Sequence, residues 1–178
     1  MIREIRMAHR HDRDAVRAVH LRAFPDGEGE VVAALAKSLL GEDSNPETIS
    51  LIALADGEIV GHVAFSPVFA NPGDSCLGYI LAPLAVVPEF HGRGIGSRLV
   101  RDGMARLAQS GIDVVLVYGD PGYYGRFGFQ AQAAENYLPP HELKFPFGWQ
   151  AAVPDGRVLV RQPVRLSCVA PLDDPSLW

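Results

Sequence analysis

The segment 91–97, with the sequence HGRGIGS, has the residue types best suited to chemistry in this chain. It follows an apolar stretch that ends at Pro88 and precedes a run with helical spacing. Three alternate glycines let the backbone approach a ligand without steric hindrance from Cβ atoms, and the start of a helix offers unpaired N–H groups and a positive dipole end. The segment therefore predicts a cradle for a phosphate or pyrophosphate group. A tight turn without a ligand is the alternative.

The glycine spacing argues against a dinucleotide ligand. A nicotinamide-binding fingerprint needs G-x-G-x-x-G, with an acidic residue roughly 20 positions later at the end of the next strand. Here the third glycine comes one residue early, and Asp113 precedes the apolar run 114–117 instead of following it. A nicotinamide-dependent oxidoreductase is therefore disfavoured.

Two segments of the chain carry a resemblance to a known family. Segment 84–97 is similar to the acetyl-CoA loop of the GNAT superfamily of N-acetyltransferases, and His91 stands where that loop has Gln or Arg. Segment 124–129, YGRFGF, resembles a Tyr-x-x-x-Gly-Phe signature of the same enzymes, and 119–129 is similar to a bacterial subgroup of predicted acetyltransferases. The similarity is clearest over 1–133, and 134–178 diverges. We expect one N-acetyltransferase domain over 1–178.

The resemblance implies an α/β (α+β) fold, with a mixed, mostly antiparallel central sheet flanked by helices and a central strand that splays from its neighbour. The hydrophobic periodicity predicts the same alternation of strands and helices. The helix that follows the glycines ends at Gly111, and the tail 173–175 is expected to be loose. The predicted strands are 1–7, 48–55, 58–69, 77–87, 112–118 and 157–166, and the predicted helices are 12–24, 30–40 and the run before Gly111.

The resemblance also implies acetyl-CoA as the cosubstrate and assigns its contacts. In the family, the splayed strand leaves backbone groups free for the pantetheine arm, and one amide points at the thioester oxygen. By position that amide belongs to Leu84, while Ala85 and Val86 make the other strand contacts. His91 either bonds to a phosphate of CoA or caps the loop. The pyrophosphate is expected on the backbone amides of Gly92, Arg93, Gly94, Ile95, Gly96 and Ser97, with the Arg93 side chain as a helper.

Tyr124 is the expected general acid, because the matching hydroxyl in relatives often lies near the sulfur of CoA. A phenol with a pKa of about 10 keeps its proton at neutral pH and can donate it to a leaving thiolate. Of the adjacent tyrosines, only Tyr124 stands four residues before Gly128. Leu84 and Tyr124 are therefore the expected catalytic residues, and packing against CoA is the alternative role for Tyr124.

The sequence offers no general base on the central strand. Relatives with a side-chain base there have Glu or His at positions that match Ile80 or Ala82, and neither of these side chains accepts a proton. A chain of water molecules, Glu28, Glu30 or Asp120 remain as alternatives.

The acceptor pocket is expected to be formed by the segment between the first two predicted helices and by the divergent region 134–150. Aromatic residues beside carboxylates in that region suit a cationic amine, although a hydrophobic flap packed on the sheet or on a second subunit is the favoured interpretation. His62, inside an apolar strand, is expected to be a core histidine. The aromatic residues of the region are Tyr137, Phe145, Phe147 and Trp149.

Composition limits the partners of the chain. The formal net charge of −5 argues against binding to nucleic acid or to an anionic membrane. No apolar run approaches the roughly 20 residues of a membrane span, and the charged N-terminal stretch is unlike a signal peptide, so a cytoplasmic location is expected. Cys76 and Cys168 are expected to be free thiols, with a disulfide as the minor alternative. No metal is expected, since His9 and His11 lack further ligands. A homodimer remains open.

These observations favour an acetyl-CoA-dependent N-acetyltransferase. It would transfer the acetyl group to a primary amine of a small molecule, or less favourably of a protein, by direct attack in a ternary complex. The alternative is a non-catalytic sensor or interaction module with the same fold that binds acyl-CoA. The acceptor and the length of the acyl group are left open by the sequence.

Overall fold

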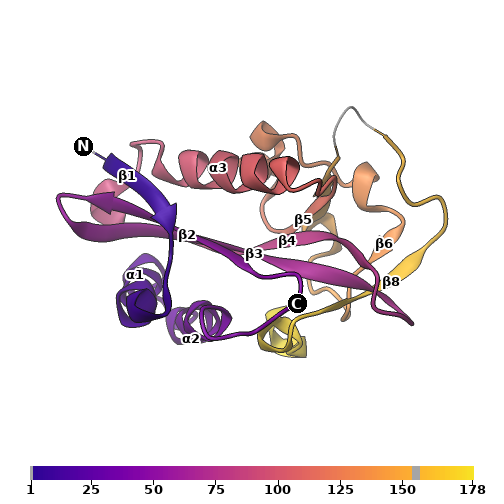
Figure 1. The fold of residues 1–178 in the computed structure, drawn as a ribbon, viewed down its shortest axis with the longest axis horizontal. Coiled ribbons are helices and arrows are strands. Elements are labelled where there is room, and N and C mark those ends of the chain that lie inside the picture. Colours follow the sequence, from indigo (N-terminus) through magenta and orange to yellow (C-terminus); the bar gives the residue numbers. More distant parts are fainter. Residues whose placement is uncertain (1, 154–156) are drawn as a thin grey trace.

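The computed structural model describes residues 2–153 and 157–178, and its eight named strands form one sheet (Figure 1). The main path of the sheet has the order β1-β2-β3-β4-β5-β7, with β6 and β8 beside it. Met1, where the first predicted strand begins, lies outside the described residues. The strands are β1 (Ile2–Met7), β2 (Ile49–Ala55), β3 (Glu58–Asn71), β4 (Cys76–Val86), β5 (Val115–Tyr118), β6 (Tyr137–Leu138), β7 (Trp149–Ala152) and β8 (Val164–Cys168).

Helices cover both faces of this sheet. Figure 1 shows α1 (Arg13–Ala23) and α2 (Gly29–Leu39) on one face and α3 (Ile95–Gln109) on the other. All strand pairs are antiparallel except β4 with β5 and β6 with β8, which are parallel. The predicted mixed, mostly antiparallel sheet flanked by helices is therefore confirmed.

The central strand β4 separates from β5 halfway along its length. The parallel pairing between them covers three positions and ends where Leu81 lies opposite Val117. On its other side, β4 stays paired with β3 as far as Val86, which lies opposite Gly61. One edge of β4 is therefore free of β5 from Ala82 onward, which is the splay that the resemblance implied.

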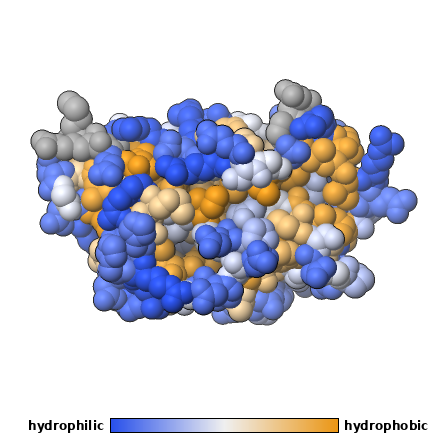
Figure 2. Space-filling view, viewed as in Figure 1, coloured by the Kyte–Doolittle hydropathy of each residue, from blue (hydrophilic) through white to orange (hydrophobic). Residues whose placement is uncertain are grey.

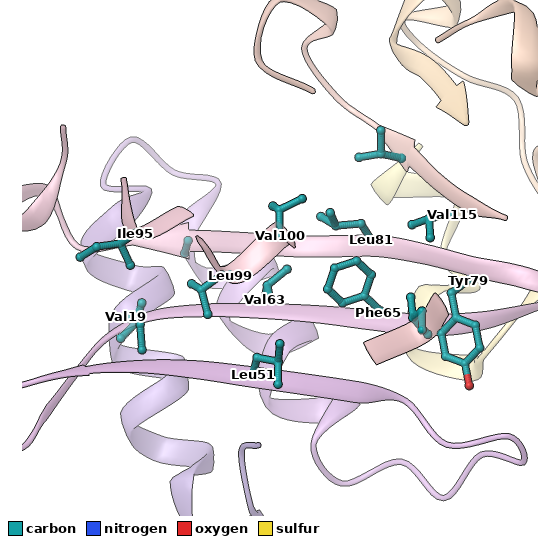
Figure 3. Close-up of a cluster of buried hydrophobic side chains, with 14 of the residues drawn as sticks. Val19, Leu51, Val63, Phe65, Tyr79, Leu81, Ile95, Leu99, Val100 and Val115 are labelled. Carbon is teal, nitrogen blue, oxygen red and sulfur yellow. The ribbon is translucent and has the colours of Figure 1, made fainter. Parts of the chain in front are cut away.

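The core under α3 fixes the position of the glycine-rich loop that precedes this helix. Ile95, Leu99 and Val100 of α3 belong to one buried cluster with Val63 and Phe65 of β3 (Figure 3). All five are almost fully buried, which makes this contact a large source of hydrophobic stabilisation. The first turn of α3 is therefore held rigidly beside the sheet.

The opposite face is closed by α1 and α2, which are amphipathic. Val16 of α1 and Ala36 of α2 pack with Ile52 of β2, and all three are fully buried. The outer surface of the two helices is mainly hydrophilic in Figure 2. An ion pair joins them there, from the Arg17 guanidinium to the Glu30 carboxylate at 2.6 Å.

The C-terminal part differs from the sequence prediction. The predicted strand 157–166 is wrong in its bounds, since β8 runs from Val164 to Cys168. The predicted loose tail is also wrong, because two short 3-10 helices, Ala170–Leu172 and Pro175–Leu177, fold back and bury Leu172 and Trp178. The Trp178 ring stacks on Tyr118, with ring centroids 6.2 Å apart. Local periodicity does not reveal a contact over this sequence distance.

Two histidines form a buried hydrogen-bonded string between α1 and the sheet. Nε2 of His20 lies 2.8 Å from Nδ1 of His62, and Nε2 of His62 lies 2.7 Å from the hydroxyl of Ser50. The interpretation of His62 as a core histidine is thus confirmed. Burial lowers the pKa of His20 to about 4 and that of His62 well below its ordinary value, so both imidazoles are neutral at pH 7.

The histidine pair predicts that the free energy of unfolding falls as the pH is lowered. Both imidazoles take up protons at a pKa of about 6.5 once unfolded, but resist them in the folded state. The loss therefore begins near pH 6.5 and continues toward the folded pKa values, at up to about 1.4 kcal/mol per pH unit for each imidazole. Urea unfolding between pH 7.5 and 5 measures this slope.

A pair of substitutions tests the source of the slope. His20→Gln removes one buried titrating group, so its dependence on pH is expected to be shallower than that of the wild type. His11→Gln, at an exposed histidine, is expected to keep the wild-type slope. Equal slopes in the wild type and both variants would contradict the assignment.

Candidate active site

A groove of about 580 Å³ opens where β4 leaves the sheet. Its floor is the end of β4, at Leu84, Ala85 and Val86, and one end is formed by the loop and first turn of α3. Phe24, at the end of α1, forms part of the wall. The groove thus lies over the unpaired edge of the strand.

The backbone of β4 presents alternate amides to this groove. The Val87 amide donates to the carbonyl of Val60 on β3 at 2.9 Å, which fixes the alternation of the ladder. Every second residue of an antiparallel strand hydrogen-bonds to the neighbouring strand, so Ala85, two residues before Val87, also turns its backbone groups toward β3. The amides of Leu84 and Val86 therefore point away from β3, toward the side that β5 has left.

The glycine-rich loop turns the chain into α3 at the end of the groove. Gly92 and Gly94 have φ angles of +72° and +73°, a conformation that side chains disfavour. Gly94 is the N-cap of α3, and the Arg98 amide makes a helical bond to its carbonyl at 3.0 Å. The three amides between them have no helical acceptor and are available to an anion. Five of the six predicted cradle residues line the groove: Gly92, Gly94, Ile95, Gly96 and Ser97.

The two basic side chains of the loop are placed differently. Nε2 of His91 donates to the carbonyl of Val86 at 2.7 Å, and His91 lines the groove. The Arg93 guanidinium lies over the ring of Phe90, 4.7 Å from its centroid, and Arg93 is not among the lining residues. In this structure His91 caps the strand end, and the Arg93 side chain is outside the predicted phosphate site.

Two further residues line the groove that the sequence analysis did not assign. They come from α4 (Pro121–Tyr124) and the turn after it. The Tyr123 hydroxyl lies close to Gly96, since a Cβ atom added to that glycine would come within 2.7 Å of it. The Arg126 guanidinium lies over the Tyr123 ring at 4.6 Å, and its Nε donates to the Tyr123 carbonyl at 2.9 Å. Tyr123 and Arg126 lie three residues apart, a spacing that a helical turn places on one face, and this was the sequence signal that could have identified them.

A second cavity, of about 240 Å³, adjoins the groove, and the two share Phe24 and Leu84 as lining. Tyr124 belongs to this second cavity. Burial raises the pKa of its hydroxyl above the ordinary value, so the group is a neutral donor at pH 7. Gly119 packs against the edge of the ring, where a Cβ atom would come within 2.5 Å of Cε2. Tyr124 is therefore held at the second cavity by close packing, and it does not line the groove itself.

The positions where relatives have a base face this second cavity. Ile80 and Ala82 both line it, and no lining residue that the structure describes carries a charge. The alternative bases lie elsewhere. Glu30 is exposed and paired with Arg17, and the carboxylate of Asp120 accepts a hydrogen bond from the Gly122 amide at 2.8 Å. Glu28, at the N-cap of α2, is exposed and lines neither cavity.

The structure agrees with the favoured interpretation of region 134–150 as a hydrophobic part packed on the sheet. All of this region is described, and none of it lines either cavity. Tyr137 and Trp149 are buried against the sheet, with the indole Nε1 of Trp149 donating to the Tyr137 carbonyl at 2.7 Å. Phe145 and Phe147 are 58% and 68% exposed. The C-terminal segment takes the place beside β4 that the sequence analysis gave to this region.

Other side chains of the described chain form no second centre. Within residues 2–153 and 157–178, no group of three or more His, Cys, Asp or Glu side chains could hold a metal ion. Cys76 and Cys168 are both free, as predicted. In the same residues, every helix is too short or too polar to cross a bilayer.

Comparison with known sequences identifies the class of protein. Residues 13–129 match the family model described as the Acetyltransferase (GNAT) family. The chain is 41% identical over 130 residues to the uncharacterized N-acetyltransferase YjhQ of Escherichia coli K12, covering 72% of this chain and 70% of the relative. The chain therefore belongs to the GNAT family of N-acetyltransferases, and it is an acyltransferase by class.

Solved structures agree with this assignment. The N-acetyltransferase YhbS of E. coli in complex with CoA superposes with a TM-score of 0.83 at 26% identity, over 98% of this chain and 94% of that one. A GNAT acetyltransferase of Brucella melitensis in complex with acetyl-CoA gives a TM-score of 0.66 at 30% identity, over 96% and 97% of the two chains. One neighbour thus holds CoA and the other acetyl-CoA, the cosubstrate that the sequence analysis predicted for this chain.

The glycine loop predicts a sharp loss of cofactor binding in Gly94→Glu. The new carboxylate would lie among the amides that face the groove and repel a phosphate. Losing two hydrogen bonds to a charged group, at about 1.5–3 kcal/mol each, lowers the affinity for CoA by at least about 100-fold. Calorimetric titration with CoA measures the change.

Gly111→Glu is the matched control for this variant. Gly111 has a φ of +79° and open space around it, as Gly94 does, but it lies beyond the other end of α3. Its affinity for CoA is expected to stay within about twofold of the wild type. An unchanged affinity in Gly94→Glu would remove the cradle assignment.

Proposed function

We propose that this chain transfers the acetyl group of acetyl-CoA to a primary amine of a small molecule by direct attack in a ternary complex. The observation that carries the proposal is the meeting of two cavities at Leu84, one over the glycine loop and one containing Tyr124. A volume of about 240 Å³ suits a small acceptor better than a protein segment. The CoA and acetyl-CoA complexes of similar chains support the cosubstrate.

The groove would hold the cofactor by its backbone. The amides at the start of α3 bind the pyrophosphate, assisted by the positive end of the helix dipole. The amide of Val86, which faces the groove, bonds to the pantetheine arm. The amide of Leu84 points toward the thioester oxygen and stabilises the negative charge that develops on it. The Arg126 guanidinium adds a positive charge beside the groove.

The chemical step needs one bond made and one bond broken. The neutral amine attacks the thioester carbon from the second cavity, and the tetrahedral intermediate carries its negative charge on the oxygen near the Leu84 amide. Its collapse breaks the carbon–sulfur bond and releases the thiolate. Tyr124 donates its proton to the sulfur, and the proton lost by the amine nitrogen passes through water to restore the phenol. The products are the acetamide and CoA.

Non-catalytic binding of acyl-CoA is the second candidate function. The observation that favours it is the apolar character of Ile80 and Ala82 at the positions where relatives have a base. Tyr124 favours the enzyme, because a module that only binds the cofactor has no need of a proton donor at the sulfur. Titration with acetyl-CoA, followed by thiol release with a panel of amines, separates the two functions. Binding without release for every amine would favour the sensor.

Tyr124→Phe is expected to lower kcat by at least about tenfold, since general acid catalysis typically contributes more than that. The dissociation constant for CoA should change less than about threefold, because the ring and its packing remain. Steady-state thiol release and calorimetry on the same preparation measure both quantities.

Tyr123→Phe is the control, because it removes the adjacent hydroxyl, which lines the cofactor groove and not the second cavity. Its kcat is expected to stay within about threefold of the wild type. Equal losses of kcat and of CoA affinity in Tyr124→Phe would make Tyr124 a packing residue.

A further inference from the structure

The second cavity has a chemical character that narrows the acceptor. Resting on the proposed function, we propose that the acceptor is a small amine whose body is uncharged and apolar, an aromatic ring or an alkyl chain, and that polycationic amines are excluded. The cavity walls, their hydrogen bonding and the volume all lead to this substrate class.

The aliphatic part of the wall comes from three parts of the chain. Val32 and Leu35 of α2 form one side, and Ile80 of β4 lies at the floor. Leu172 and Leu177 of the C-terminal segment form the other side. An apolar ligand in this space is removed from water and packs on aliphatic side chains. The free energy of binding gains about 25 cal/mol for each Å² of apolar surface that is buried.

The aromatic residues of the wall add apolar ring surface to the lining, and two of them have polar groups with partners inside the protein. The indole Nε1 of Trp178 donates to the carbonyl of Leu172 at 3.0 Å. The hydroxyl of Tyr118 accepts a hydrogen bond from the Phe145 amide at 2.8 Å. Tyr124 remains as the hydroxyl beside Leu84, where the reaction would take place. The Trp178 and Tyr118 side chains are therefore engaged within the protein, and the Tyr124 hydroxyl lies at the reacting end.

A second ammonium group on the acceptor would meet no counter-charge in this wall. The acidic side chains of the adjoining C-terminal segment have other partners, since Asp173 pairs with His141 at 2.7 Å and Asp174 accepts a hydrogen bond from the Ser176 amide at 2.9 Å. Burying an unpaired charge costs far more than burying an amide or a hydroxyl. Diamines and larger polycations are therefore poor acceptors.

The size of the cavity limits the body of the acceptor to about one ring. An apolar cavity of ~150 Å³ is large enough for benzene. The volume of about 240 Å³ here leaves room for a ring with a short chain, or for an alkyl chain of similar bulk. Phenethylamine and hexylamine are suitable probes.

The same apolar walls explain how the enzyme works without a base at Ile80 or Ala82. An amine loses the hydration of its charged form on entering a low-dielectric site, so its neutral, nucleophilic form is favoured there. The proton is thus left in solvent as the amine enters. The walls both select the body of the acceptor and deliver its nitrogen in the reactive state.

Two amines of similar length test the proposal on the wild-type protein. Hexylamine ends in a methyl group, and cadaverine ends in a second ammonium group. The ratio of their kcat/KM values, from thiol release with acetyl-CoA, is expected to favour hexylamine by at least about tenfold. Phenethylamine should be accepted like hexylamine. Calorimetric binding of each amine to the complex with CoA provides a readout that does not require turnover.

A pair of valines on α2 provides the matched variants. Val32 is partly exposed and lines the cavity, whereas Val31 is 51% exposed and does not. Val32→Glu is expected to lower kcat/KM for hexylamine by about tenfold or more and to reduce its advantage over cadaverine. Val31→Glu should leave both values within about twofold. The affinity of both variants for CoA should be unchanged, which controls for folding.

The outcomes separate this inference from the proposed function. If hexylamine bound to the CoA complex but caused no thiol release from acetyl-CoA, the cavity assignment would be supported and the transferase would be overturned. Turnover of cadaverine equal to that of hexylamine, or equal effects of the two valine substitutions, would overturn the inference and leave the transferase intact. If Val32→Glu changed the preferred length of the acyl donor instead, the cavity would hold the acyl chain, and the inference would also fail.

Discussion

The separation of β4 from β5 after Leu81 is the constraint on which the site depends. Three positions of parallel pairing hold the strands together, and beyond them β4 continues with one edge free. That edge supplies the amides of the groove, and both cavities lie against it. The buried contacts of α3 with β3 keep the glycine loop in line with the free edge. A fully paired sheet would have the same core but no place for a thioester.

The two ends of the site differ in chemical character, one being electropositive and the other apolar. At the cofactor end, backbone amides, a helix N-terminus and Arg126 present fixed positive character to an anion. At the proposed acceptor end, the described walls have no charged side chain and present mainly apolar surface. A charged ligand half and an uncharged ligand half would meet at Leu84, between these environments. In the proposed ternary complex, this contrast would orient both ligands without a charged residue at the reacting atoms.

The sequence correctly predicted those parts of the fold that depend on patterns of residues close together in the chain. The glycine spacing at 92–96 and the apolar periodicity of α3 are local signals, and the structure follows both. The absence of a base on β4 was also visible, at Ile80 and Ala82. The wall formed by Trp178 could not be predicted, because its burial depends on packing with Tyr118 and Trp149, far away in sequence. The short strand β7 was missed for a similar reason, since it is defined by pairing with β5.

Phe24 belongs to both cavities, and its ring stacks near His20 at the end of α1, with centroids 6.3 Å apart. A side chain that contacts two ligands couples their occupancy. If the arrival of the cofactor orders this ring, the acceptor binds to a wall that is already set. Linkage then requires the acceptor to tighten the cofactor by the same factor. Under the proposed function, the order in which the substrates bind and the synergy between them would then depend on one aromatic ring at the end of α1.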